Sequence, residues 1–75
     1  MEDIVILDGA RTAIGTFGGS LAATPPTALG VHVAQEAMAR AGVSPDQIGH
    51  VAMGHVINTE PRDMYLSRVT AIEAG

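Results

Sequence analysis

Two mainly apolar segments stand out from the hydrophobic and polar pattern along the chain. The first is Ile4 to Leu7, and the second lies within His50 to Ile57. A strand with one wet face alternates apolar and polar residues, whereas a strand buried on both faces, as in a parallel sheet, does not. The pattern therefore predicts two buried strands, with Gly54 marking a close approach of neighbouring backbone in the second.

A helical pattern separates these runs. Apolar residues recur at four-residue intervals from Leu29 to Ala41, which is the spacing of one helix face. Thr24 is predicted to cap this helix, and the prolines that follow it suit a first helical turn, where a missing N–H costs nothing. Gly42 is predicted to end the helix.

Two further patterns follow along the chain. Ser44 to Gln47 has the residues of a capping box and predicts a single helical turn that ends by Gly49. A last helix is predicted from about Arg62 to Ala74. On the first helix, Glu36 and Arg40 are spaced to pair one turn apart.

The predicted order of elements is strand, helix, strand and helix. More than a dozen residues separate the two strands, so we expect them to be parallel and joined by a right-handed crossover. The fold class is therefore α/β, with a βαβα opening. Because both strands are apolar on two faces, each requires sheet neighbours and two helical layers, and we expect further strands after Gly75.

The length and composition of the chain also indicate that these residues do not form a complete domain. Seventy-five residues make at most one domain, and 47% of them are apolar, which argues against disorder. Large core-filling side chains are scarce, since the chain has one Phe, one Tyr and no Trp. We therefore expect residues 1–75 to be the start of a domain and not a complete one.

Charge limits the partners. The formal net charge is −4 and lysine is absent, which argues against nucleic acid or an anionic membrane as partner. No apolar run approaches the ~20 residues of a membrane span, and no secretory signal is recognised. The absence of cysteine fits a reducing compartment and excludes a cysteine nucleophile within these residues.

A glycine-rich loop follows the first apolar run, with three glycines between positions 15 and 19. Phosphate binding is the obvious function for such a loop. The spacing is G-x-x-G-G, however, whereas a dinucleotide-binding loop requires G-x-G-x-x-G and a Walker loop requires a lysine. The residues favour the alternative, a connection that carries the chain over the end of a sheet.

The histidines His32, His50 and His55 are candidates for metal binding or acid–base chemistry. No pair has a metal-ligand spacing such as H-E-x-x-H, and no serine lies in G-x-S-x-G. In the predicted strand, His50 and His55 lie on opposite faces. We interpret all three as ordinary hydrogen-bonded histidines.

Three charged residues gather at the start of the last predicted helix. Asp63 is electrostatically favoured near a helix N-terminus. Arg62 or Arg68 could hold a carboxylate or a phosphate through two parallel hydrogen bonds. The alternative is a solvated or interfacial ion pair, which is the commoner use of such residues.

Four segments, taken in order, carry a likeness to a known family. They are the loop from Arg11 to Leu21, the helix end Arg40-Ala41-Gly42, the stretch Met53-Gly54-His55-Val56, and the closing helix with Arg68 and Ala71 to Gly75. Together they resemble the N-terminal part of the thiolases (acetyl-CoA acetyltransferases or 3-ketoacyl-CoA thiolases). The resemblance implies a layered α-β-α-β-α fold in two similar halves, of which residues 1–75 open the first.

The resemblance also implies an activity. Thiolases condense or cleave 3-ketoacyl-CoA: a cysteine takes the acyl group, a histidine activates it, and a second cysteine handles protons. The motifs that carry these groups lie beyond Gly75, so no catalytic, cofactor-binding or metal-binding residue is assigned to this chain. The resemblance implies an acyl-CoA substrate, no separate cofactor, a cytoplasmic location, and a homodimer or homotetramer.

The chain departs from the family pattern at two places. Many thiolases have lysine at the position of Thr16. Many also have Gly-Gln-Asn-Pro-Ala-Arg-Gln where this chain has the stretch from Asn58 to Leu66. This version resembles bacterial β-ketothiolases that accept longer acyl chains and supply polyhydroxyalkanoate synthesis, which implies a broader substrate range.

Two other interpretations stay open. A ketoacyl-synthase-type condensing enzyme shares the superfold and would differ in the residues around its nucleophile. A small non-enzymatic α/β module that binds a partner would require residues 1–75 to fold cooperatively on their own.

Overall fold

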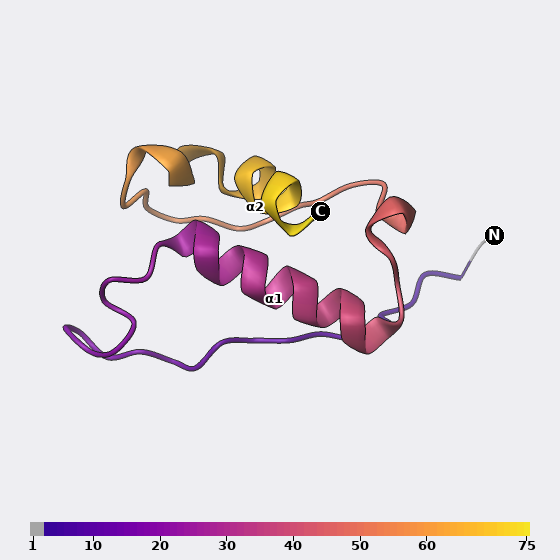
Figure 1. The fold of residues 1–75 in the computed structure, drawn as a ribbon, viewed down its shortest axis with the longest axis horizontal. Helices are drawn as coiled ribbons and strands as arrows, with labels where there is room; N and C mark the ends of the chain where they lie inside the picture. Colours follow the sequence, from indigo (N-terminus) through magenta and orange to yellow (C-terminus); the bar gives the residue numbers. More distant parts are fainter. Residues whose placement is uncertain (1–2) are drawn as a thin grey trace.

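The computed structural model describes residues 3–75, and their regular elements are all helical (Figure 1). The α-helices are α1 (Pro26–Ala41) and α2 (Leu66–Ala74). Two 3-10 helices, η1 (Pro45–Gln47) and η2 (Pro61–Tyr65), lie between them along the chain. The described chain is elongated, with extents of 46 × 23 × 22 Å.

Proline and glycine set the ends of α1. Pro26 occupies its first helical position, where a missing N–H leaves no hydrogen bond unmade. The predicted cap by Thr24 is wrong, because the N-cap position falls one residue later, on Pro25, which has no polar side chain. At the other end Gly42 has a left-handed φ of 70°, and its N–H donates to the carbonyl of Ala39. The predicted helix end is therefore confirmed.

The remaining helical predictions are confirmed with one difference. The backbone N–H of Ser44 donates to Oε1 of Gln47 at 2.9 Å, and η1 is the single turn that this capping box predicts. The last helix ends at Ala74 as expected, but its first turn is the separate 3-10 helix η2 and only the remainder is α-helical. Short 3-10 turns are frequent where α-helices begin.

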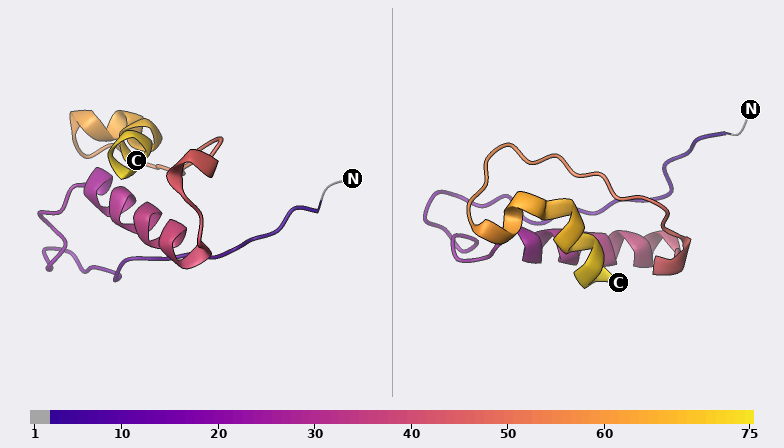
Figure 2. Two further views of the ribbon diagram at one scale, coloured as in Figure 1. Left: turned by 45° about the vertical axis from the view of Figure 1, so that its right-hand side comes forward. Right: turned by 90° about the horizontal axis from the view of Figure 1, so that it is seen from above.

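The two predicted strands are not formed within residues 3–75. The apolar segment before α1 and the segment from position 48 to 58 do run in the same direction, opposite to α1, in both Figure 1 and Figure 2. This is the path of a parallel strand–helix–strand unit, without its ladder of hydrogen bonds. A strand exists only by pairing, and no described segment pairs with either one. The family resemblance implies a first strand that begins near Met1, and that start lies outside the described residues.

The predicted burial of the apolar runs is likewise not found in residues 3–75. Ile4 is 98% exposed and Ile6 is 95% exposed. In the second run, Val56 is 96% exposed. No apolar side chain of the described residues is buried, so these helices and segments enclose no hydrophobic core of their own.

Contact between α1 and α2 is made by small and polar residues. Thr27 and Gly30 of α1 and Thr70 of α2 are buried. A Cβ atom placed on Gly30 would lie 2.5 Å from Oγ1 of Thr70, which is closer than real Cβ contacts. Glycine at this position therefore permits the close approach of the two helices.

Candidate functional site

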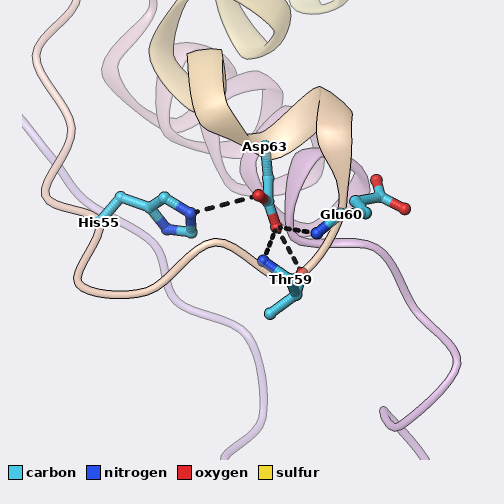
Figure 3. Close-up of polar contacts among 4 residues, drawn as sticks. All are labelled: His55, Thr59, Glu60 and Asp63. Carbon is cyan, nitrogen blue, oxygen red and sulfur yellow. Dashed lines mark hydrogen bonds and ion pairs between the residues drawn. The ribbon is translucent and has the colours of Figure 1, made fainter.

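Asp63 is the one charged residue of positions 3–75 that is fully buried. It lies in the first turn of η2, as Figure 3 shows. Its Oδ2 accepts a hydrogen bond from the backbone N–H of Thr59 at 2.8 Å and another from the backbone N–H of Glu60 at 3.2 Å. The hydroxyl of Thr59 donates to the same oxygen. All three donors come from the two residues before η2, so the carboxylate ties this turn together.

The local sequence explains this arrangement. Glu60 is the N-cap of η2 and Asp63 is its third residue, which is the position from which a side chain reaches back to the N-cap N–H. Pro61, between them, has no N–H to satisfy. A negative charge in the first turn also complements the partial positive charge of the helix end. The placement of Asp63 at a helix N-terminus, expected from the sequence, is confirmed.

His55 faces this carboxylate from the preceding segment (Figure 3). Its Nε2 lies 3.6 Å from Oδ1 of Asp63, just beyond hydrogen-bond length. Both atoms are buried, and neither has a hydrogen-bond partner among the described residues. The imidazole is mostly covered, with 21% of its side chain exposed.

Competing effects set the pKa of Asp63. Removal of the carboxyl from water raises its pKa, because the charged form loses hydration. The hydrogen bonds from the Thr59 side chain, the Thr59 N–H and the Glu60 N–H, together with the charge of His55, lower it by more. The net pKa lies below the usual value for aspartate, so the carboxyl is charged at neutral pH.

The expected cluster of Arg62, Asp63 and Arg68 is not formed as a unit. The guanidinium of Arg62 binds the carboxylate of Glu73 in α2, and no ion pair joins it to Asp63. This confirms the ion-pair interpretation for Arg62. None of the ion pairs within residues 3–75 includes Arg68, which lines an open groove beside the helices.

That groove has a volume of about 1040 Å³. Small side chains from both helices line it, including Ala34 and Ala37 of α1 and Ala71 and Ala74 of α2. Polar groups at its wall include Asp8, His50 and Arg68. Small apolar side chains can pack against such a surface. The groove holds no thiol and therefore no acyl-accepting cysteine.

The other predicted candidates are separate from the Asp63 turn. His32 is exposed on α1, and His50 is exposed in the groove wall. In the glycine-rich loop, the N–H of Gly19 donates to the carbonyl of Thr16 at 2.9 Å, so the loop is a tight turn.

Within residues 3–75, no three His, Cys, Asp or Glu side chains come together in a way that could hold a metal ion. No helix of this part of the chain is long and apolar enough to cross a membrane.

Sequence reasoning missed the partnership of Asp63 with Thr59 and His55. The spacing from Glu60 to Asp63 is a capping-box signal that could have indicated the hydrogen bond to the N-cap N–H. The approach of His55 depends on the path of the backbone from 55 to 59. No residue pattern in that segment specifies the path.

Comparison with known proteins gives one family. Residues 4–75 match the family described as "Thiolase, N-terminal domain". The chain is 59% identical, over 74 residues, to a protein of Cupriavidus necator named "Beta-ketothiolase BktB". That match covers 99% of this chain and 19% of the relative.

Two relatives named "Acetyl-CoA acetyltransferase" agree with this. The one from Cupriavidus necator is 48% identical over 75 residues, which is 100% of this chain and 19% of the relative. The one from Clostridioides difficile is 39% identical over 75 residues and is covered to 69% of its own length. The chain thus spans about a fifth of the length of the two Cupriavidus relatives.

Proposed function

Because this chain belongs to the thiolase family, through the thiolase N-terminal domain, we propose that it is the N-terminal part of an acyl-CoA C-acyltransferase. The complete enzyme condenses two acyl-CoA molecules or cleaves a 3-ketoacyl-CoA. The observation that carries the proposal is the family match along residues 4–75, supported by 59% identity to a β-ketothiolase.

The chemistry divides between this chain and the remainder of the enzyme. Acyl transfer between thiols requires a nucleophile that forms a thioester, and a cysteine thiolate does this best near neutral pH. This chain has no cysteine. In the proposal, the acyl-accepting cysteine and its histidine therefore lie beyond residue 75, and residues 1–75 supply scaffold for the first half of the enzyme.

The proposal includes the finer fold. In the complete protein, the segments around Ile4–Leu7 and positions 50–57 become parallel strands of a layered α-β-α-β-α fold, with α1 as their crossover. Their common direction supports this (Figure 2), as does the exposure of Ile4, Ile6 and Val56. Pairing with neighbouring strands would satisfy their backbone groups and remove these side chains from water.

The substrate is proposed to be an acyl-CoA thioester, without a separate cofactor. The stretch from Asn58 to Leu66, which differs from the common thiolase pattern, supports a substrate range that extends beyond two-carbon acyl groups, as in polyhydroxyalkanoate synthesis. We also propose a cytoplasmic homodimer or homotetramer, for which the family resemblance is the support.

Acyl transfer by the protein at its natural length tests the proposal. We expect thiolysis of acetoacetyl-CoA, condensation of acetyl-CoA, and an acyl group attached to one cysteine in a mass spectrum of the quenched enzyme. Residues 1–75 alone should show none of these. Failure of the natural-length protein on every 3-ketoacyl-CoA tried, or turnover by residues 1–75 alone, would overturn the proposal.

The substrate range is tested separately. We expect the natural-length enzyme to join propionyl-CoA to acetyl-CoA at a rate within about tenfold of the acetyl-CoA pair, a span that corresponds to ~1.4 kcal/mol in the barrier. Strict rejection of every chain longer than two carbons would contradict the range, while leaving the acyltransferase assignment intact.

A further inference from the structure

Two buried polar atoms face each other without a hydrogen bond in the turn before η2. They are Nε2 of His55 and Oδ1 of Asp63, 3.6 Å apart. Buried polar groups are nearly always hydrogen-bonded, so an unpaired donor and acceptor at this separation require an explanation. Figure 3 shows the imidazole edge pointing directly at the carboxylate.

The other oxygen of Asp63 is already occupied. Oδ2 accepts from Thr59 and Glu60, and these bonds hold the carboxylate in place while Oδ1 remains available. The side chain therefore has one oxygen committed to the turn and one directed at His55. A group held in this way can receive a proton donor without moving the backbone.

The other charged groups on the neighbouring elements either lie away from His55 or pair with residues other than His55. The carboxylate of Glu60 points away from His55 in Figure 3. Arg62 of η2 pairs with Glu73 of α2, and Arg40 of α1 pairs with Glu36. Also on these helices are His32, which is exposed on α1, and Arg68, which is exposed on α2. No acidic side chain of positions 3–75 other than Asp63 lies within 4 Å of a His55 ring nitrogen.

We propose that His55 and Asp63 form a pH-dependent latch that holds the segment before η2 against the capped turn. With a proton on Nε2, the imidazole donates to Oδ1, and the positive ring and negative carboxylate form a charge-assisted hydrogen bond. A neutral ring loses the ion-pair attraction: with its proton on Nε2 it keeps only an ordinary hydrogen bond to Oδ1, and with its proton on Nδ1 two lone pairs face each other and the contact is lost. Imidazole groups change charge between about pH 5 and pH 8, so the latch closes on mild acidification.

The carboxylate remains available over that range. Hydrogen bonds from Thr59 and Glu60 hold the pKa of Asp63 below the usual aspartate value, so Asp63 stays charged at pH 5.5. The charge of the carboxylate is therefore constant across the pH range of the latch. This inference rests on the geometry of the turn and does not depend on the proposed acyltransferase activity.

Hydrogen exchange of the turn tests the latch. Thr59 and Glu60 both donate backbone N–H groups to Asp63, so their protection reports how firmly the turn is held. In the protein at its natural length, we expect His55→Gln to lower the protection factor of peptides spanning 55–66 by about tenfold at pH 5.5, the effect of losing one hydrogen bond to a charged group. At pH 8.5 we expect a clearly smaller effect, because a neutral ring binds the carboxylate less strongly than a charged one.

His50→Gln is the matched control, since it removes an exposed histidine from the same segment. It should leave protection of 55–66 unchanged at both pH values. In an Asp63→Asn background, His55→Gln should add nothing further at pH 5.5. Equal loss of protection at pH 5.5 and pH 8.5 would mean that His55 acts by packing alone and would overturn the latch, as would no loss at either pH.

A variant that disturbs the whole fold would obscure this result. Gln keeps the size and polarity of the imidazole closely enough that we expect the circular dichroism of His55→Gln to match the parent. A ¹⁵N spectrum of the unmodified protein supplies an independent measurement, in which the proton of His55 is expected on Nε2 at pH 5.5. A proton found only on Nδ1 at that pH would also overturn the proposal.

Discussion

The turn around Asp63 and the apolar segment Ile4–Leu7 differ in where their physical requirements are met. The turn is held together by local hydrogen bonds: the carboxylate of Asp63 is fully buried, and the three donors to its Oδ2 come from Thr59 and Glu60, within four residues of it, while Oδ1 faces His55. The apolar segment satisfies nothing within residues 3–75, since Ile4 and Ile6 are almost fully exposed and no ladder forms.

This difference follows from the range of the interactions involved. Caps and turns are closed by side chains a few residues away, so a short length of chain carries everything they need. A strand buried on both faces requires neighbours that are distant in sequence, and its stabilisation comes from burial of apolar surface. The described chain therefore contains locally determined helices and turns beside exposed apolar segments.

A charge placed in the apolar run is the most severe test of this contrast. Ile6 is 95% exposed in the described chain, so Ile6→Asp would be harmless if that exposure persisted in the complete protein. If Ile6 becomes part of a buried strand, an unpaired carboxylate there should cost at least ~3 kcal/mol of unfolding free energy or prevent folding. Urea denaturation of the natural-length protein, or its loss from the soluble fraction, measures the effect.

Ile14→Asp is the control for that substitution. Ile14 is 88% exposed and lies in the connection after the predicted strand. It should tolerate the charge, with a change of about 0.5 kcal/mol or less, as is usual for surface positions. Equal tolerance at Ile6 and Ile14 would show that the first apolar run is not a buried strand.

The contact between α1 and α2 should give the next largest effect. Gly30→Val places two methyl groups where even a Cβ would lie 2.5 Å from Oγ1 of Thr70. Overpacking of this kind costs about 1–3 kcal/mol, and the helices must separate to relieve it. Ala28→Val, at an exposed position of the same helix, should cost only the lower helix propensity of valine, roughly 0.5 kcal/mol of unfolding free energy. Similar urea midpoints for the two variants would refute the close approach of the helices.

Titration of the Asp63 carboxyl itself should have a smaller effect on stability, confined to pH values below the range in which the latch with His55 is tested. The folded-state pKa of Asp63 is lowered, so its stabilisation is fully present above the unfolded aspartate pKa of about 3.9 and is lost as the pH falls through the lower folded value. The parent protein should therefore melt at a higher temperature than Asp63→Asn above about pH 4, with the two converging below that pH. A difference that grew on further acidification would contradict the assigned direction of the shift.

The same distinction between local and long-range interactions explains how much of the structure could be predicted from the sequence. The end of the first helix at Gly42, the turn after Ser44 and the last helix up to Ala74 were all predictable, because each is set by residues next to it. The cap at Thr24 was predicted wrongly, because prolines stand at both positions 25 and 26 and the helix begins at the second, which moves the N-cap position to Pro25. In the turn, Asp63 was placed correctly, but no residue pattern indicated the approach of His55.

The predicted strands are the opposite case, because a strand depends on partners that are distant in sequence. The apolar segments and the length of the crossover predicted two parallel strands. The two segments do share a direction (Figure 1), but no strand forms within residues 3–75, because neither segment pairs with another. The family likeness, by contrast, was visible in the sequence, because it depends on residue identities along the whole chain and residues 4–75 match the family.

The smallest expected effect belongs to the ion pair of Glu36 and Arg40 on α1. Its two charged groups lie 2.8 Å apart one helical turn from each other, and both side chains are about half exposed. Water and salt screen such a pair, so Glu36→Gln should cost only about 0.3–0.5 kcal/mol at low ionic strength. The cost should fall further in 1 M salt, where the Debye length is about 3 Å. A salt-independent loss above ~1 kcal/mol would mean that Glu36 is buried in the complete protein, and α1 would then have covered faces on both sides.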